Sequence, residues 1–405
     1  MNVLAVLLFV LLAVSTVLAR RGQCNQSSDC ANDLLCEEGF CYTIQEMAQI
    51  IQTPSGSVYN STPSQSFPLT LFSAQMTQMY VVIHVIQLTC FIFSQFTNFL
   101  LLYLIWTKAR KVLGAYRYLM GIFSLYAIVY NYVDIITQPL VVIEKQMYVV
   151  VNHGPLRYLP LIGFVFTCMF GASFGLCISL LSTQFFYRYL AVCRPTVLQQ
   201  LEGRRLAIIF IPPITVSVTW FFMCYFGLGI TPEKQQVLKR PFMEGFGEDS
   251  SKIPFVSSMY WRVDESGQKH WNMPDCIGSL GLAALMSICC LTIVLCAVKT
   301  YKKMNDAGNS MSDRTRELNR QLFITLSLQT LLPFMLMYGP VGFLFLLPFF
   351  NANVGGVANV AAVTTALYPA IEPLIAIFCI KTFRKALICY RDGTKVSSAV
   401  ASTVA

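Results

Sequence analysis

The chain has 405 residues, of which 55% are hydrophobic and 12% charged, with a mean hydropathy of +0.58 and a formal net charge of +9. A water-soluble globule of this size would have too little polar surface to cover itself, so the composition excludes that class and indicates an integral membrane protein. The positive charge is a topology signal and does not imply a nucleic-acid partner.

An apolar stretch from Leu4 to Val17 opens the chain and runs into Val17-Leu18-Ala19, a pattern typical of a signal-peptidase site. The stretch is too short to span a bilayer comfortably, so we predict a signal peptide at residues 1–19. The alternative is a reverse membrane anchor, because no Lys or Arg precedes the stretch while Arg20 and Arg21 follow it.

Residues 20–42 contain four closely spaced cysteines, Cys24, Cys30, Cys36 and Cys41. Their even number and an extracellular location predict two disulfides, with three pairings left open. Zinc is the weaker alternative, since thiolate sites usually pair cysteines roughly two to four residues apart and these gaps are five, five and four. The stretch resembles the small secreted cysteine modules of nematodes called EB modules.

Residues 43–78 are rich in Ser, Thr, Gln and Pro and are predicted to be a flexible linker. Asn25 and Asn60 lie in N-x-S/T sequons and are predicted glycosylation sites. Pro63, directly after the second sequon, disfavours its use.

Seven apolar stretches have the length of roughly 20 residues that crossing a bilayer requires. Backbone amides in lipid have no water to bond, so all seven must be helices. We therefore expect an all-α seven-transmembrane helix bundle at residues 79–390, behind a small disulfide-rich extracellular segment and ahead of a tail at 391–405. The expected spans are Met79 to Trp106, Tyr118 to Ile143, Leu159 to Tyr187, Leu206 to Leu228, Cys276 to Val298, Gln321 to Leu347 and Gly355 to Ile380.

Charge predicts the orientation of this bundle. One set of alternate loops, together with the tail, holds 19 of the 29 Lys and Arg residues against five acids, a net of +14. The segments on the opposite side hold 10 basic and 13 acidic residues. Because positive charge stays in the cytoplasm, the amino terminus is predicted outside and the tail inside.

Two acids fall within the spans, Asp134 and Glu372, and a buried ionisable group is a functional candidate because its burial is costly. Asp134 lies about 24 Å from the cytoplasmic edge at the helical rise of 1.5 Å per residue, so it belongs to the outer third. Asp134 and Tyr130 are the predicted ligand contacts. Glu372 lies near the inner end of its span, which separates it from Asp134.

Glu372 is flanked by Pro369 and Pro373, and Asn98 in the first span lies at nearly the same depth. A hydrogen bond from Asn98, or protonation of Glu372, would relieve the burial penalty. The prolines bend the helix and free backbone carbonyls, which polar neighbours can satisfy. We expect an inner-half hinge with a polar latch, and the alternative is a static polar contact between helices.

Further polar features lie near the inner ends of the last two spans. Gln321, Thr325 and Gln329 form one polar stripe that leads to Pro333, as expected of any helix facing a bundle axis. Cys389, just past the last span among basic residues, is a candidate palmitoylation site or a free tail cysteine.

Four segments resemble known receptor motifs. YRYLAVCRP (Tyr187 to Pro195) resembles the arginine motif that G-protein-coupled receptors carry at the inner end of the third span. The stretches from Leu113 to Pro139, Arg316 to Pro340 and Tyr368 to Leu387 resemble the signature blocks of nematode serpentine chemoreceptors, closest to the str class. The resemblance covers about residues 70 to 390.

This resemblance implies a chemosensory receptor in the ciliary plasma membrane of a sensory neuron, with a heterotrimeric G protein as partner. It carries Arg188 over as the coupling switch, with Tyr187 and Tyr189 beside it, although Tyr187 stands where rhodopsin-like receptors have an acid. Tyr368 joins Pro369, Glu372 and Pro373 in the last-span motif of conformational residues. Besides membrane lipids, the expected partner is a small, neutral, largely apolar odorant, with no cofactor or metal.

Three other functions were weighed. A transporter could use the two acids as stations of a proton path, but the spans show no inverted repeat. A ligand-gated channel of the insect odorant-receptor kind places its amino terminus inside, against the charge pattern. An enzyme is disfavoured because His84, His153 and His270 are far apart in sequence and no catalytic or phosphate-binding motif is present.

One departure from rhodopsin-like receptors concerns the outer disulfide. No cysteine lies at the outer end of the third span, and Cys168 is too deep in the membrane to be expected to pair with Cys276. The long outer loop 230–275 is therefore expected to lack that tether.

Overall fold

The computed structural model describes residues 34–37, 40–43, 67–108, 113–201, 203–263, 268–306, 313–350 and 354–389. The chain divides into two compact units, residues 1–72 and 73–405. The predicted signal peptide, the two sequons with Asn25 and Asn60, and Cys24 and Cys30 lie outside the described residues.

The first unit contains a short hairpin. Strand β1 (Leu34–Glu37) pairs antiparallel with β2 (Phe40–Thr43), and the register places Cys36 opposite Cys41. The disulfides and the cysteine module remain predictions.

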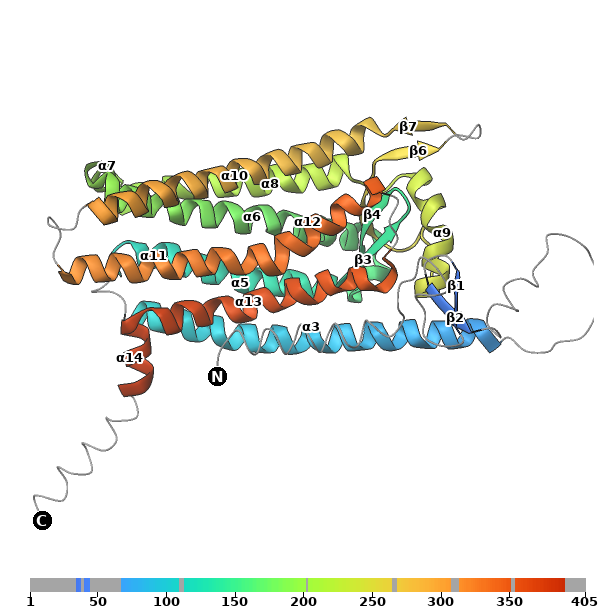
Figure 1. Ribbon diagram of the computed structural model, residues 1–405, viewed down its shortest axis with the longest axis horizontal. Helices are drawn as coiled ribbons and strands as arrows, with labels where there is room; N and C mark the ends of the chain where they lie inside the picture. Colours follow the sequence, from blue (N-terminus) through green and yellow to red (C-terminus); the bar gives the residue numbers. More distant parts are fainter. Residues whose placement is uncertain are drawn as a thin grey trace, which may run out of the picture. The chain divides into compact units, whose positions relative to one another are not determined.

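Within the described ranges, seven helical segments are long and apolar enough to cross a membrane, which confirms the predicted fold class. Helix α6 is central and packs on α5, α8 and α10, while α13 packs on α5 and α11 (Figure 1). The spans are α3 (Phe67–Thr107), α5 (Tyr116–Thr137), α6 (Pro160–Cys193), η3 with α8 and η4 (Gly203–Phe210, Ile211–Phe222, Met223–Gly227), α10 (Met273–Asp306), α11 with η5, α12 and η6 (Asp313–Pro333, Phe334–Tyr338, Gly339–Leu346, Leu347–Phe350), and η7 with α13 (Gly355–Asn359, Val360–Cys379).

Two predicted boundaries were wrong. The second span was expected to reach Ile143, but α5 ends at Thr137 and Gln138 takes a left-handed conformation with φ 40°. Pro139 then begins a strand, because a proline disfavours the α conformation in the residue before it and the β-branched residues that follow favour a strand. Residues 67–78, predicted to end a flexible linker, are helical and belong to α3.

Two spans are interrupted by π-helical turns, η4 in the fourth span and η5 in the sixth. Pro333 ends α11 directly before η5, as expected of a proline that cannot donate a backbone hydrogen bond. Such wide turns often mark functional positions within a helix. Both turns face the cavity described below.

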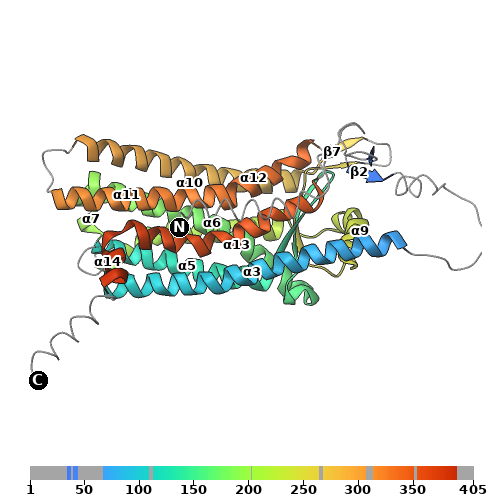
Figure 2. The ribbon, with the colours of Figure 1, turned by 60° about the horizontal axis from the view of Figure 1, so that its bottom comes forward.

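The end of the bundle that is predicted to face outward carries a sheet that the sequence did not predict. Strands β3 (Pro139–Glu144), β4 (Met147–Asn152) and β5 (Phe255–Met259) pair antiparallel in the order β3-β4-β5. Helix α9 (Pro232–Phe246) packs on the sheet, at the end of the bundle opposite α7 (Pro195–Gln200) and α14 (Lys381–Cys389) (Figure 2). We call β3, β4, β5 and α9 the outer lid. Two more strands, β6 (Trp261–Val263) and β7 (Lys269–Trp271), form a separate hairpin, and η2 (Pro155–Tyr158) precedes α6.

Successive side chains of a strand point to opposite faces of its sheet, and β4 is buried on both. Met147, Val149 and Val151 are fully buried in a cluster with Leu238 and Phe242 of α9. Tyr148, between them, packs on the other face against the helices. The lid is thus a two-layered structure with a dry core above the bundle.

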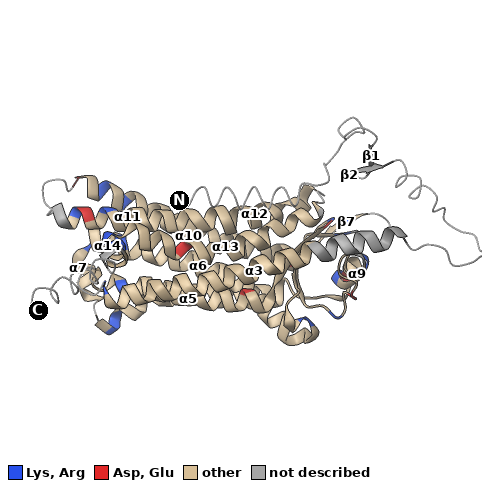
Figure 3. Ribbon diagram, turned by 90° about the horizontal axis from the view of Figure 1, so that it is seen from below, with Lys and Arg blue, Asp and Glu red and all other residues tan. Residues whose placement is uncertain are grey.

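The two ends of the bundle differ in charge. Lys and Arg gather at the end that carries α7, α14 and the start of α11 (Figure 3). This is the end that the charge pattern predicts to be cytoplasmic.

Candidate functional site

A cavity of about 180 Å³ lies beneath the outer lid, between the third, fourth, fifth and sixth spans. Its walls are mainly aromatic and aliphatic, with six hydroxyl-bearing residues. The lining residues are Tyr148, Val150, Val256, Ser257 and Ser258 of the lid, Thr167, Phe170, Gly171 and Phe174 of α6, Trp220, Cys224 and Leu228 of the fourth span and the segment after it, Ser279, Leu282, Ala283 and Met286 of α10, and Tyr338, Val341, Gly342 and Phe345 of the sixth span.

Most hydroxyl groups in this wall already have partners. Ser258 Oγ and Ser279 Oγ are 3.0 Å apart, which joins the lid to α10. The Tyr338 hydroxyl donates to the Phe174 carbonyl at 2.8 Å, joining η5 to α6. Ser257 Oγ is buried without a hydrogen-bond partner among the described residues. The cavity can therefore hold a small apolar molecule and offers few polar groups to orient it.

The predicted ligand contacts, Asp134 and Tyr130, do not line this cavity. Both are buried, and Tyr130 approaches the wall only through its ring, 6.1 Å from that of Phe170. Asp134 Oδ1 has no hydrogen-bond partner in the described part of the chain. Their contact with a ligand remains a prediction, and the cavity that the structure contains is built from other residues.

Tyr130 instead satisfies a carbonyl that a proline has freed. In a helix the carbonyl of residue i accepts from the amide of residue i+4, and proline has no amide hydrogen. Pro369 therefore frees the carbonyl of Thr365, which accepts from the Tyr130 hydroxyl at 3.4 Å. Tyr130 lies on α5, so this hydrogen bond connects two spans at the bend.

The carbonyl that the second proline of α13 frees also accepts hydrogen bonds from another span. Pro373 frees the carbonyl of Pro369, which accepts from Ser94 Oγ at 2.8 Å and from Asn98 Nδ2 at 3.1 Å. Asn131 Nδ2 of α5 donates to the same Ser94 hydroxyl at 2.6 Å. The polar residues opposite the prolines thus hold α13 to α3, as the sequence predicted in outline.

The expected hydrogen bond between Asn98 and Glu372 is absent, because the Asn98 amide nitrogen is committed to Ser94 and to the Pro369 carbonyl. Glu372 Oε1 accepts instead from Gln329 Nε2 of α11, and Glu372 Oε2 is buried without a partner among the described residues. Gln329 was seen only as one member of a polar stripe. No local signal in the sequence distinguishes Gln329 from the other polar residues of that stripe as the partner of Glu372.

Tyr368, one turn before Glu372, is fully buried between α13 and α6. Its hydroxyl lies 3.4 Å from Cys177 Sγ of α6. The last-span motif therefore contacts three neighbouring spans: α6 through Tyr368, α3 through Pro369 and α11 through Glu372.

Arg188, the predicted coupling switch, is turned into the bundle and only 5% exposed. Its guanidinium lies over the Tyr116 ring, 4.2 Å from the centroid, and its Nη1 donates to Asn319 Oδ1 of α11 at 3.4 Å. Tyr187 also stacks on Tyr116, whereas Tyr189 points away, with the Lys299 ammonium 5.8 Å from its ring. The inner end of the third span is thereby closed by α5 and α11.

A second set of contacts joins the inner ends of α11 and α14. Glu317 pairs with Lys381 at 3.0 Å and with Arg320 at 3.0 Å, and Gln321 Nε2 donates to the same carboxylate at 2.7 Å. These groups are exposed, so water and salt screen the pairs and they add little to stability. Cys389 is the last residue of α14, and its palmitoylation remains a prediction.

The outer lid is held by a buried ion pair in place of a disulfide. Cys168 and Cys276 are both free thiols, in line with the expectation that they do not pair. Lys234 of α9 is 1% exposed, and its Nζ lies 2.9 Å from Asp275 Oδ2 at the start of α10. The ammonium also donates to the Gly229 and Ser257 carbonyls at 2.8 and 3.0 Å. Burial lowers the pKa of Lys234, and the Asp275 carboxylate opposes this effect.

Two histidines far apart in sequence meet at the edge of the lid. His84 Nε2 and His153 Nδ1 are 2.9 Å apart, and the two rings stack with an interplanar angle of 7°. Arg157 Nη1 can only donate to His153 Nε2, so the other ring nitrogen of His153 must donate to His84. Burial lowers the pKa of His153 to about 4, and the Arg157 charge acts in the same direction. In the described part of the chain, no group of three or more His, Cys, Asp or Glu side chains could hold a metal ion.

Comparison with known proteins agrees with this architecture. The model of the serpentine type seven-transmembrane chemoreceptor family Str matches residues 83–388. Serpentine receptor class r-10 of Caenorhabditis elegans is 30% identical over 304 residues, 74% of this chain and 88% of that protein. Its counterpart in Caenorhabditis briggsae is 27% identical over 313 residues, 76% and 90% of the two chains. The G-protein coupled receptor str-217 of Caenorhabditis elegans is 25% identical over 296 residues, 72% and 84% of the two chains. This chain therefore belongs to the Str family of serpentine seven-transmembrane G-protein-coupled chemoreceptors.

Proposed function

We propose that the receptor binds a small, neutral, largely apolar odorant in the cavity beneath the lid and answers by activating a heterotrimeric G protein. The observation that carries this proposal is the cavity itself, enclosed by four spans and lined mainly by aromatic and aliphatic side chains. Its volume of about 180 Å³ exceeds the roughly 150 Å³ of an engineered apolar cavity that takes up benzene. A ligand the size of one aromatic ring fits it.

The contacts around the cavity support a route from ligand to G protein. Tyr338 and Phe174 both line the cavity and are hydrogen-bonded to each other, so a ligand there changes the spacing of η5 and α6. Tyr338 follows Pro333 in the sixth span, and α11 of that span contacts Arg188 through Asn319. A shift of the sixth span would uncover Arg188, which is buried when α11 is in place.

The orientation in the membrane belongs to the same proposal. The basic end with α7 and α14 would face the cytoplasm, where the G protein is, and the lid would face outward. The amino terminus would then be outside, in a receptor of the plasma membrane. The sensory cilium is the compartment that the chemoreceptor family favours.

A matched pair of substitutions on α10 tests ligand binding. Leu282 is buried and lines the cavity, whereas Leu280 is 71% exposed on the same helix. In cells that respond to a volatile compound in a calcium or cAMP assay, Leu282→Trp should abolish the response and Leu280→Trp should preserve it. Equal responses of the two variants would contradict the proposed site.

Coupling is tested separately. Arg188→Ala should abolish the agonist response while surface expression is retained, because an uncharged side chain cannot make the contact predicted for the guanidinium. Arg262→Ala is the control, since it makes the same change at an exposed arginine beside the outer lid. An unchanged response of the Arg188 variant would contradict the coupling role.

A further inference from the structure

The cavity is closed toward the outside by the lid. Its roof is formed by β4 and β5, with Tyr148 and Ser258 facing inward. Directly above them, Met147, Val149 and Phe255 are 0% exposed and belong to the core that the sheet shares with α9. A ligand arriving from water would have to separate two packed layers, which would expose this core.

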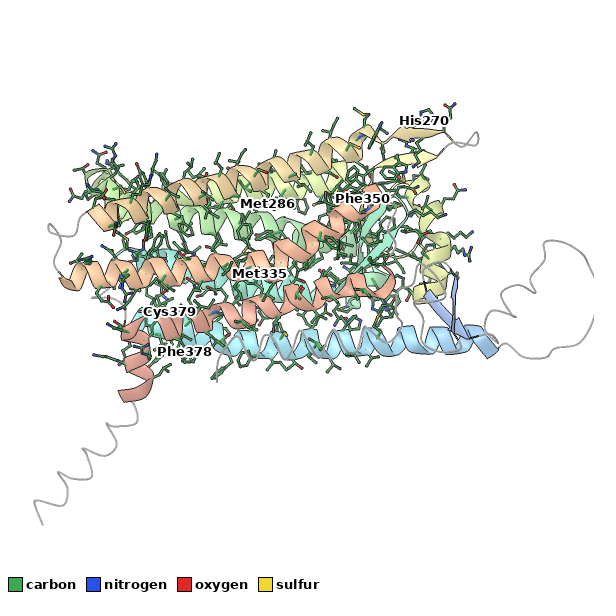
Figure 4. The ribbon with its side chains drawn as sticks, viewed as in Figure 1. His270, Met286, Met335, Phe350, Phe378 and Cys379 are labelled. Carbon is green, nitrogen blue, oxygen red and sulfur yellow. The ribbon has the colours of Figure 1, made fainter. Side chains whose placement is uncertain are left out.

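The accessible part of the wall lies between the fifth and sixth spans. Among the lining residues Ala283 is exposed and Met286 is half-buried, both on α10, while Gly342 and Phe345 of α12 are also half-buried. Most other lining residues are buried. The cavity thus reaches the surface between α10 and α12, and Figure 4 marks Met286 on the first of these helices.

The packing of the two helices explains this opening. Helix α10 packs on α6 and η4, whereas α12 packs on η5 and α13, so each is held from its own side. A Cβ atom placed on Gly342 would meet no atom within 4 Å. The missing side chain at this position leaves the space between the helices unfilled.

The opening lies at the depth of the lipid hydrocarbon. Ala283 and Met286 are about 15 to 20 Å along α10 from its first residue at the helical rise, inside a hydrocarbon core of about 30 Å. The surface beside it is apolar, with Leu280 at 71%, Ile288 at 62% and Phe343 at 63% exposure. The molecules that reach this opening are those that dissolve in the bilayer.

We propose that the ligand enters the cavity sideways from the bilayer, through a portal formed by Ala283 and Met286 of α10 and by Gly342 and Phe345 of α12. This inference rests on the proposed function and narrows it, because the receptor would sample the membrane concentration of its ligand. Its ligands would be neutral molecules that partition into lipid, and permanently charged molecules of the same size would be excluded.

Bromobenzene is a suitable probe, since it is neutral, close in size to benzene and quenches tryptophan fluorescence. Trp220 lines the cavity, so binding to the full-length receptor in phospholipid nanodiscs should give saturable quenching that Trp220→Phe removes. Stopped-flow mixing then yields the association and dissociation rates. Ala283→Leu should slow both rates by about tenfold and leave Kd within about twofold, because it narrows the passage at the exposed edge of the cavity and leaves the buried wall in place.

Ala284→Leu is the matched control. Ala284 is also exposed on α10 but does not line the cavity, so its variant should have wild-type rates. Gly342→Ala, for which the structure has room, should slow both rates in the same direction as Ala283→Leu. Saturable quenching with unchanged rates in both portal variants would overturn the portal and leave the binding site intact. Absence of saturable quenching in the wild type would overturn the binding site, and the portal with it.

Discussion

Removal of the Lys234 ammonium should loosen the outer lid. In Lys234→Met, the Asp275 carboxylate would stay buried with one remaining donor, the Met259 amide at 2.7 Å. The Gly229 and Ser257 carbonyls would also lose the hydrogen bonds that the ammonium gives them. Removing one partner of a buried ion pair costs about 3 to 5 kcal/mol. With an unfolding entropy of about 2.1 cal/mol/K per residue, a chain of 405 residues shifts by about 1.2 °C per kcal/mol, so the lower figure corresponds to a loss of about 3.5 °C in Tm.

Buried cysteines provide the assay. Cys168 and Cys224 lie beneath the lid at 0% and 4% exposure, so a fluorogenic maleimide should react with them only as the lid opens. A thermal ramp of the purified receptor with this dye should show the Lys234→Met transition displaced downward. Lys252→Met, a change of the same kind at an exposed lysine of the outer side, should leave the transition in place.

A compensating variant separates the buried charge from simple loss of packing. Asp275→Asn keeps an acceptor for the Met259 amide and removes the negative charge. In combination with Lys234→Met it should recover at least about 2 kcal/mol, because no unpaired charge would remain. The reasoning would be refuted by a Lys234→Met transition within one degree of wild type, or by a double variant less stable than Lys234→Met.

Three further predictions concern the bundle and the edge of the lid. Tyr130→Phe should destabilise the receptor by about 1 to 3 kcal/mol, since it leaves a proline-freed carbonyl unsatisfied, and a melting curve equal to wild type would contradict this. Glu372→Leu breaks the contact between α13 and α11 and should raise basal signalling in the cAMP assay. Glu372→Gln keeps an acceptor and should stay closer to wild type, and an equal rise in both would show that charge holds the helices. Because the pKa of His153 is lowered to about 4 from an unfolded value near 6.5, its contribution to stability is complete above pH 6.5 and is lost as the pH falls toward 4. At about 1.4 kcal/mol per pH unit, this amounts to at most about 3.5 kcal/mol, and His153→Gln should flatten the dependence of Tm on pH. A dependence equal to that of the wild type would contradict this.

The spans were predictable because their signal is local. A stretch of roughly 20 apolar residues has one stable conformation in lipid, so length and composition suffice to identify it. The second span shows where this fails. Residues 139–143 are apolar like the helix before them, but Pro139 and the β-branched residues after it change the conformation from helix to strand. A hydropathy reading counts apolar residues and does not register that change of conformation.

The outer lid was not predictable by the same means. Its central strand β4 pairs with β5, more than 100 residues later in the sequence, and the ion pair joins Lys234 to Asp275 across an intervening hairpin. Neither contact leaves a periodic or local pattern in the sequence. A lysine in a polar loop is also usually exposed, so the sequence gives no reason to expect Lys234 in a buried pair. Only the packed structure shows that this one is 1% exposed.

The last-span motif lies between these two cases. Depth along the helices was enough to bring Asn98 to the level of the prolines, and it does donate there, to the Pro369 carbonyl. Depth could not decide the partner of Glu372, because several spans offer polar residues at that level. Rotation of α11 about its axis decides it, and Gln329 is the residue that this rotation presents.

The sixth span links the wall of the cavity to the end of the bundle that carries Arg188. Helix α13 is held at both of its prolines by side chains of α3 and α5, and α10 is held to α6 and the lid. The sixth span has a π-helical turn after Pro333 and borders the cavity and its opening, and its inner end contacts α6 through the hydrogen bond from Arg188 to Asn319. A ligand that changes the wall near Tyr338 would therefore act on a span that also carries the hydrogen-bond partner of Arg188. Since displacing this span would free Arg188 from Asn319, a ligand that arrives through the opening between α10 and α12 would have its effect at the inner end.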